Sequence, residues 1–319
     1  LRLSMKVLVV SGFLGAGKTT FITEMARRSR RKFVVMENEM GAVGVDGGLL
    51  SDALGDGIEV WELTQGCICC SMKSDFATSV LTIESALQPE YLLVEPTGVG
   101  MLSRIMDNLS KIAYERIELL SPITLLDSLN CRSQAREFPE LFVDQLASAG
   151  TVVFSKAENL PPEERAALEE LARRHAPKAE IVSQPYGQQS ADWWETLWRK
   201  ALDGSLLKEE APEADLGLAV ASLVGPRISS PSAMVMLLED LLRGRFGHVV
   251  RAKGTVESSV GRLRFDVAGG QYCLSGAEND ENEAQAVFIG KALDKTALYK
   301  ALNAREAGHQ GFTLEPFGS

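Results

Sequence analysis

The sequence lacks the features that mark membrane-spanning and secreted proteins. No apolar run approaches the roughly 20 residues that span a bilayer, and the chain does not begin with a pattern typical of a signal peptide. The chain has five cysteines, an odd number, and three of them are clustered within residues 67–70. This is not the paired framework of a secreted disulfide protein. We therefore expect a protein of the reducing cytoplasm with no membrane partner.

The chain also lacks the positive charge of a nucleic-acid-binding protein. Its net charge is −10 and no long basic stripe occurs, so we expect no nucleic-acid partner. The three histidines are isolated from one another, which argues against storage of many metal ions. A length of 319 residues is enough for two domains.

Short apolar runs alternate with helical stretches through the first part of the chain. Such runs, separated by helices, are typical of a parallel sheet that is covered on both faces. They lie at residues 7–10, 33–36, 57–63, 91–94, 123–126, 151–154 and 181–182. We predict an α/β fold, a doubly wound and mainly parallel sheet with helices on both faces.

The composition changes after Trp198, and a charged stretch containing proline follows it. Beyond that stretch, runs of strands with a helix at each end predict a small α+β domain. We therefore predict a first domain over residues 1–205, a linker over 206–216 and a second domain over 217–319.

A phosphate-binding loop joins the first predicted strand to the first predicted helix. Residues 12–20 read GFLGAGKTT and match the pattern G-x-x-x-x-G-K-[ST]. Glycines let backbone N–H groups turn toward phosphates, and the helix N-terminus adds its positive dipole. Lys18 would reach the β- and γ-phosphates, and the Thr19 hydroxyl would bind Mg²⁺. The nucleotide-binding residues predicted here are Gly12, Gly15, Ala16, Gly17, Lys18, Thr19 and Thr20.

Three clustered thiols follow the strand predicted at 57–63, in the sequence GCICC. Thiolates select zinc, cobalt, nickel or copper over magnesium. Cys67 and Cys69 would lie on the same side of an extended backbone, with Cys70 beside them. A redox pair or small buried side chains are the alternatives, and we favour a transition-metal site.

Acidic residues close the second predicted strand and stand in the glycine-rich loop after it. Asp46, in this loop, is a candidate for the Mg²⁺ shell, because the loop after the first helix of such nucleotidases senses Mg²⁺ and the γ-phosphate. Glu37 or Glu39 is a candidate hard ligand that completes the thiolate site. The alternative for each carboxylate is simple solvation at a strand end or turn.

The fourth predicted strand, at 91–94, ends in Glu95-Pro96-Thr97-Gly98. An acid at the carboxyl end of a strand beside the phosphate loop suits water-mediated contact with Mg²⁺, which makes Glu95 a candidate catalytic residue. Gly98 has no side chain and would donate its N–H to a γ-phosphate at close approach.

Four motifs in this order and spacing, SGFLGAGKTT, ENEMGAVGVDG, GCICC and EPTG, resemble those of the CobW-type GTPases, a branch of the metallochaperone P-loop GTPases. The stretches at 251–254 and 287–290 are similar to the family's small accessory domain. By this match Cys67 and Cys69 are the first-choice metal ligands and Glu37 is a third.

The resemblance implies a GTPase that converts GTP to GDP and phosphate with Mg²⁺. It also implies that hydrolysis is coupled to delivery of a divalent transition metal, Zn²⁺ or Co²⁺, to a client metalloprotein or a cobalamin-related enzyme. A nucleotide-dependent homodimer is a further expectation. Two rivals remain: an ATP-using P-loop enzyme, and a regulatory adaptor that holds a structural metal or none.

The sequence departs from the family's pattern at two sites. Ala42 stands where the family usually carries an acid, so one metal ligand that some members use is missing. The guanine motif N-K-x-D reads Ser155-Lys156-Ala157-Glu158. Glu158 can still accept hydrogen bonds from guanine N1 and N2, but its extra methylene must be accommodated, so we expect a relaxed preference for guanine.

Four other features carry structural expectations. Cys131 and Cys273 are predicted to be small buried hydrophobes. Asp127, at the end of the strand predicted at 123–126, is either structural or part of the nucleotide site. The tryptophans within residues 193–198 are predicted to pack their helix on the sheet.

Overall fold

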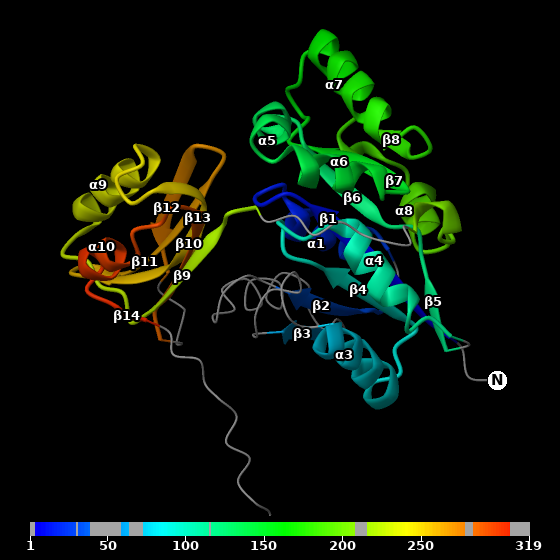
Figure 1. Cartoon of the computed structure of the whole chain (residues 1–319), viewed down its shortest axis with the longest axis horizontal. Coiled ribbons are helices and arrows are strands. Elements are labelled where there is room, and N and C mark those ends of the chain that lie inside the picture. Colours follow the sequence, from blue (N-terminus) through cyan, green and yellow to red (C-terminus); the bar gives the residue numbers. More distant parts are fainter. Residues whose placement is uncertain are drawn as a thin grey trace, which may run out of the picture. The chain divides into compact units, whose positions relative to one another are not determined.

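The computed structural model describes residues 4–29, 31–38, 59–63, 73–114, 116–207, 216–277 and 283–306 (Figure 1). These residues form two compact units, and the chain passes from the first to the second between Gly217 and Leu218. The first unit carries a parallel sheet and the second an antiparallel sheet.

The sheet of the first unit is parallel at every described strand pair, in the order β3-β2-β4-β1-β6-β7-β8 with β5 on β1. Its strands are β1 (Met5–Gly12), β2 (Val34–Asn38), β3 (Glu59–Leu63), β4 (Tyr91–Glu95), β5 (Ile117–Leu119), β6 (Ile123–Asp127), β7 (Thr151–Ser155) and β8 (Glu180–Val182). The predicted doubly wound fold is confirmed. Among the strands that the structure describes in this sheet, only β5 was not predicted.

Helices cover both faces of this sheet (Figure 1). They are α1 (Lys18–Arg28), α3 (Lys73–Ala86), α4 (Leu102–Ser110), α5 (Cys131–Glu137), α6 (Pro139–Ala147), α7 (Pro162–His175) and α8 (Ala191–Leu197). Apolar side chains of α3, α4, α6 and α7 share one buried cluster, and those of α1 and α8 share the other. None of the helices among the described residues is long and apolar enough to cross a bilayer.

Tryptophans fix α8 and its C-terminal end on the sheet, as predicted. Trp194 and Trp198 are fully buried. The Trp198 ring centroid lies 4.9 Å from that of Phe33 and 5.1 Å from that of Tyr91. Trp194 packs on Phe21 of α1 at 5.2 Å. The first sheet, α1 and the chain after β8 are therefore held together by aromatic contacts.

The second unit is a six-stranded antiparallel sheet in the order β12-β11-β10-β13-β9-β14. Its elements are β9 (Ala219–Val224), α9 (Pro231–Leu242), β10 (His248–Ser258), β11 (Gly261–Ala268), β12 (Gln271–Gly276), β13 (Gln285–Lys291), α10 (Lys295–Ala301) and β14 (Arg305–Glu306). Both helices contribute to the buried cluster of this unit. The predicted small α+β domain is confirmed, and β12 and β14 are additions that the sequence pattern did not predict.

The two cysteines within the described residues differ in burial. Cys131 is fully buried in the first unit, as predicted. The prediction for Cys273 was wrong, because this thiol is exposed. Side chains alternate between the two faces of a strand, and on the edge strand β12 it is Tyr272 and Leu274 that pack on the core.

We predict that Trp198→Ala lowers the free energy of unfolding by about 3–5 kcal/mol, because the substitution leaves a cavity between Phe33 and Tyr91. Urea denaturation followed by circular dichroism measures the loss. Trp193→Ala is the matched control, since Trp193 is only partly buried on the same helix. Equal losses in the two variants would contradict the packing role given to Trp198.

Candidate nucleotide-binding site

The phosphate-loop sequence forms the turn from β1 into α1. Gly17 occupies the position before α1 with φ 83°, a left-handed conformation that favours glycine. Helix α1 then begins at Lys18, and its first N–H groups lack partners within the helix. The strand–loop–helix context predicted from the sequence is thus confirmed, and it provides an anion-binding helix N-terminus.

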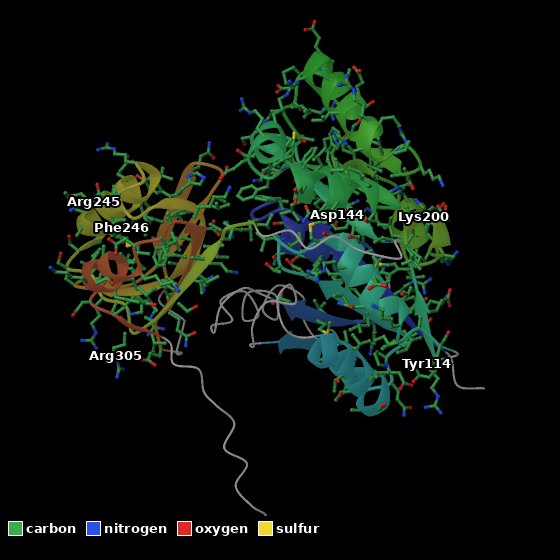
Figure 2. The ribbon with its side chains drawn as sticks, in the orientation of Figure 1. Tyr114, Asp144, Lys200, Arg245, Phe246 and Arg305 are labelled. Atoms are coloured by element: carbon green, nitrogen blue, oxygen red, sulfur yellow. The ribbon has the colours of Figure 1, made fainter. Side chains whose placement is uncertain are left out.

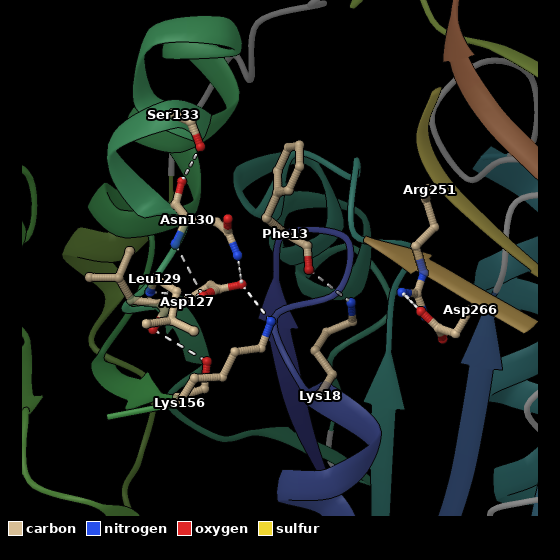
Figure 3. A network of polar contacts seen from close by, with 11 residues as sticks. Phe13, Lys18, Asp127, Leu129, Asn130, Ser133, Lys156, Arg251 and Asp266 are labelled. Atoms are coloured by element: carbon tan, nitrogen blue, oxygen red, sulfur yellow. Dashed lines mark hydrogen bonds and ion pairs between the residues drawn. The ribbon is translucent and has the colours of Figure 1, made fainter. Parts of the chain in front are cut away.

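Lys18 is held at the phosphate loop by hydrogen bonds to the loop backbone. Its side chain is buried, and its Nζ donates to the carbonyl oxygens of Gly12 at 3.2 Å and Phe13 at 3.5 Å (Figure 3). The Glu95 carboxylate lies 4.0 Å from the same ammonium. The structure therefore brings together two residues, one from the first helix and one from β4, that the sequence had assigned separately to nucleotide chemistry.

A second carboxylate stands beside Glu95. Glu37 of β2 and Glu95 of β4 are partners in the strand register, and both are buried, with exposed fractions of 4% and 9%. Neighbouring like charges in a buried site favour a bound cation, because each raises the free energy of the other. Lys18 supplies one positive charge there, and a divalent ion would supply more.

The segment after β4 lies directly on the phosphate loop. A Cβ built on Gly98 would lie 2.4 Å from the Leu14 nitrogen and 2.8 Å from the Phe13 carbonyl carbon. No side chain fits in this space, so only glycine permits this contact with the phosphate loop. The EPTG motif and the phosphate loop therefore form one site, although about eighty residues separate them in the sequence.

Two buried hydroxyls lie in the two motifs that meet here. Ser11 and Thr97 are buried, and neither hydroxyl has a hydrogen-bond partner among the described residues. Buried polar groups are normally satisfied by protein, water or a ligand. Sequence reasoning gave neither residue a role, although both lie within motifs that it identified, SGFLGAGKTT and EPTG.

The motif predicted to read the base follows β7. Ser155 is buried, and its hydroxyl donates to the Leu126 carbonyl at 3.4 Å. A Cβ on Gly17 would lie 4.0 Å from the Ser155 Cβ, so this motif adjoins the phosphate loop. Lys156 has φ 55°, a left-handed conformation, and Glu158 is exposed to solvent. Glu158, which stands where the family has aspartate, is therefore accessible to a ligand from solvent.

Asp127 fixes the lysine of this motif. Its buried carboxylate accepts hydrogen bonds from the backbone N–H groups of Leu129 and Asn130, from the Asn130 side chain, and from Lys156 Nζ at 2.7 Å (Figure 3). These contacts give Asp127 a structural role, the first of its two alternatives. Through this role it holds Lys156, which is predicted to bind the nucleotide.

Arg165 of α7 ties the base motif to the loop after β8. Its guanidinium donates to the carbonyl oxygens of Ala157 at 3.2 Å and Leu160 at 3.3 Å, and to that of Ser183. Tyr186 lies in the loop after β8. Burial raises the pKa of the Tyr186 hydroxyl, and the negative charges of Glu158 and Glu24 raise it further. The short turn that begins at Tyr186 contacts β7, the strand that ends at Ser155 of the base motif, and local sequence patterns do not reveal this proximity.

The predicted transition-metal site falls mostly outside the described residues. Outside these residues lie Cys67, Cys69 and Cys70, and also Glu39 and Ala42. Asp46, which was predicted for the Mg²⁺ shell, lies outside them as well. Within the described ranges, no group of three or more histidine, cysteine, aspartate or glutamate side chains could hold a metal ion. Glu37 is the predicted ligand for which the structure gives a position.

Comparison with known proteins identifies the family. Residues 6–183 match the family model described as CobW/HypB/UreG, nucleotide-binding domain. The chain belongs to this family. Residues 222–306 match the cobalamin synthesis protein cobW C-terminal domain.

Curated relatives share the first part of the chain. The zinc chaperone YeiR of Escherichia coli is 32% identical over 183 residues, covering 56% of this chain and 55% of that protein. The zinc chaperone CobW of Sinorhizobium sp. is 26% identical over 216 residues, covering 57% and 60%. The chain thus spans little more than half the length of these relatives. A crystal structure of the Zn(II)-bound YjiA GTPase from E. coli aligns with 94% of this chain and 98% of that chain, at 20% identity and a TM-score of 0.46.

We predict that Gly98→Ala weakens nucleotide triphosphate binding about tenfold or more, the equivalent of ~1.4 kcal/mol, because the new methyl group pushes the EPTG segment off the phosphate loop. Titration calorimetry with a non-hydrolysable GTP analogue measures the change. Gly187→Ala serves as the control, since a Cβ there meets nothing within 4 Å. Wild-type affinity in Gly98→Ala would contradict the close contact.

Proposed function

We propose that this protein is a GTPase that hydrolyses GTP to GDP and phosphate and couples the reaction to delivery of a divalent transition metal. The observation that carries the proposal is the convergence of Lys18, Glu95 and Gly98 on the phosphate loop. Membership of the CobW/HypB/UreG family supports it. Because two matched relatives are named zinc chaperones, zinc is the first candidate for the cargo and cobalt the second.

Each phosphate-site residue has a defined task in this proposal. The loop backbone and Lys18 neutralise the phosphate oxygens, and the Gly98 N–H binds the γ-phosphate. The Glu95 carboxylate, next to the Lys18 ammonium, would contact Mg²⁺ through water. Thr19 and Asp46 would hold Mg²⁺, which when bound neutralises charge that develops on the β- and γ-phosphates. The residues that surround the phosphates are Gly12, Gly15, Ala16, Gly17 and Thr20.

The base lies, in this proposal, against Ser155, Lys156 and Glu158. The exposed Glu158 carboxylate would accept hydrogen bonds from guanine N1 and N2, which adenine cannot donate. Lys156 would cover the base from the position in which Asp127 holds it. Because Glu158 is longer than the family's aspartate, we expect GTP to be preferred over ATP by a smaller margin than in relatives with aspartate.

The metal is carried by Cys67 and Cys69, with Cys70 and Glu37 as further ligands. Thiolates suit Zn²⁺ and Co²⁺, and Glu37 joins this site to the nucleotide site because it lies beside Glu95 in the strand register. Hydrolysis would then shift the protein between a metal-holding and a metal-releasing state. The clustered thiols require a reducing compartment, so we assign the reaction to the cytoplasm.

We further propose that residues 1–205 form the GTPase domain, that 206–216 form a linker, and that 217–319 form an accessory domain that docks the client. The match of residues 222–306 to the cobW C-terminal domain supports the last assignment. The client would be a metalloprotein or a cobalamin-related enzyme.

We predict that Lys18→Ala lowers kcat/KM for GTP by about 100-fold or more, equivalent to ~2.7 kcal/mol, because the ammonium no longer balances the phosphate charge. Release of inorganic phosphate measures the rate. Lys111→Ala is the control, since Lys111 is exposed and its side chain pairs with Asp107, one turn earlier. Undiminished hydrolysis by Lys18→Ala would refute the phosphate-loop assignment.

We predict that the double substitution Cys67→Ser and Cys69→Ser abolishes stoichiometric binding of Zn²⁺ and Co²⁺, because a serine hydroxyl does not replace a thiolate toward these ions. Elemental analysis of the purified protein with a GTP analogue bound gives the stoichiometry. Cys273→Ser is the matched control, an exposed thiol on β12. If the double variant keeps its metal, the cysteine assignment is wrong.

A further inference from the structure

Helix α6 supplies two buried polar side chains to the segment that joins β4 to α4. Asp144 and Gln145 have exposed fractions of 2% and 4% (Asp144 is labelled in Figure 2). The Gln145 amide nitrogen donates to the Gly98 carbonyl at 3.3 Å and to the Gly100 carbonyl at 3.2 Å. One Asp144 carboxylate oxygen accepts the Ser103 N–H at 3.1 Å. The helix thus holds the segment at Gly98 and Gly100, and it also caps the first turn of α4.

The packing of α6 explains why these side chains reach inward. Leu141, Phe142 and Leu146 bury the helix against the first unit, and Asp144 and Gln145 lie on the turn between them. The backbone of Gln145 is itself anchored, because the Thr124 hydroxyl of β6 donates to its carbonyl at 2.8 Å. Gln145 is therefore a fixed donor rather than a mobile surface side chain.

The receiving segment depends on α6 for its order. The residue before α4, Met101, offers no side-chain cap, so Asp144 provides the cap from a neighbouring helix. Within the segment, the Gly100 N–H donates to the Thr97 carbonyl at 2.9 Å and closes a turn. Gln145 bonds to two carbonyls of this turn, and since both partners are acceptors, only its amide nitrogen can face them.

The turn carries the group that would recognise the γ-phosphate. The N–H and C=O of Gly98 are separated by one Cα, so fixing the carbonyl restricts the directions that the N–H can take. The other side of Gly98 is fixed by the backbone of Phe13 and Leu14, which a Cβ would overlap. Gln145 and the phosphate loop thus hold this glycine from two sides.

We infer that Gln145 is a positioning residue for γ-phosphate recognition, which it orders in advance by bonding to the Gly98 and Gly100 carbonyls. The inference rests on the proposed function, because it assumes that the Gly98 N–H meets the γ-phosphate of GTP. Its consequence is selective. GTP meets Gly98 and GDP does not, so loss of Gln145 weakens GTP binding and leaves the binding of GDP to the phosphate loop intact.

Gln145→Met tests this inference, because it keeps the length of the side chain and removes both N–H donors. Titration calorimetry measures the dissociation constants of a non-hydrolysable GTP analogue and of GDP for the full chain. We expect the analogue to bind about tenfold more weakly, with GDP within about twofold of wild type. Gln134→Met on the adjacent helix α5 is the control, a buried glutamine for which no side-chain bond to the β4–α4 segment occurs among the described residues.

A second variant, Gln145→Glu, tests the same role in case Gln145→Met does not fold. Gln145→Glu places a carboxylate against the same two carbonyls, where it donates only when protonated. We expect the same selective loss for the GTP analogue at pH 7.5, with partial recovery at pH 5.5. Equal losses for GDP and the analogue, or no loss for either in a folded variant, would overturn the role of Gln145. A wild-type protein that binds neither nucleotide would instead overturn the proposed function, and this result needs no variant.

Discussion

The contact between Gly98 and the backbone of Phe13 and Leu14 is the constraint on which the rest of this site depends. A methyl group does not fit there, so the end of β4 and the phosphate loop cannot move apart or rotate without breaking the close fit. Glu95 is brought beside Lys18 by the same contact, three residues earlier on the strand. The parallel order β2-β4-β1 makes this geometry inevitable, because parallel neighbours end at the same edge.

Charge at this edge follows from the same strand order. Placing β2 next to β4 puts Glu37 and Glu95 in register, both buried. Such a pair is costly without positive charge nearby, and Lys18 lies within 4.0 Å of one member. A nucleotide with its cation would change the balance of charge here. The proposed metal binding at Glu37 and the proposed nucleotide chemistry at Glu95 would therefore affect one another through electrostatics, even before any movement of the chain.

The sequence predicted those parts of the site that depend on local pattern. The phosphate loop was identified because its spacing is a backbone requirement, and Gly98 because a strand end and a missing side chain suffice to suggest a close approach. Most strands were predicted because burial gives them short apolar runs. Helices were predicted after the phosphate loop, at the tryptophans and at the two ends of the second domain, but α3, α4, α5 and α6 were given no bounds. The strand β5 and the exposure of Cys273 were not predicted, and Cys273 lies on an edge strand whose side chains are exposed or half-buried.

The residues that position the site could not be predicted from local sequence patterns, because their contact partners are distant in the chain. Gln145 is 47 positions from Gly98, and Asp127 is 29 positions from Lys156. Nothing in the PELFVDQLA sequence of α6 distinguishes a glutamine that orders a turn from one that faces solvent. What distinguishes it is the fold, which presents α6 to the β4–α4 segment. Helix α6 therefore holds the segment beside the phosphate loop, whereas Asp127 and Arg165 hold the motif that is predicted to read the base.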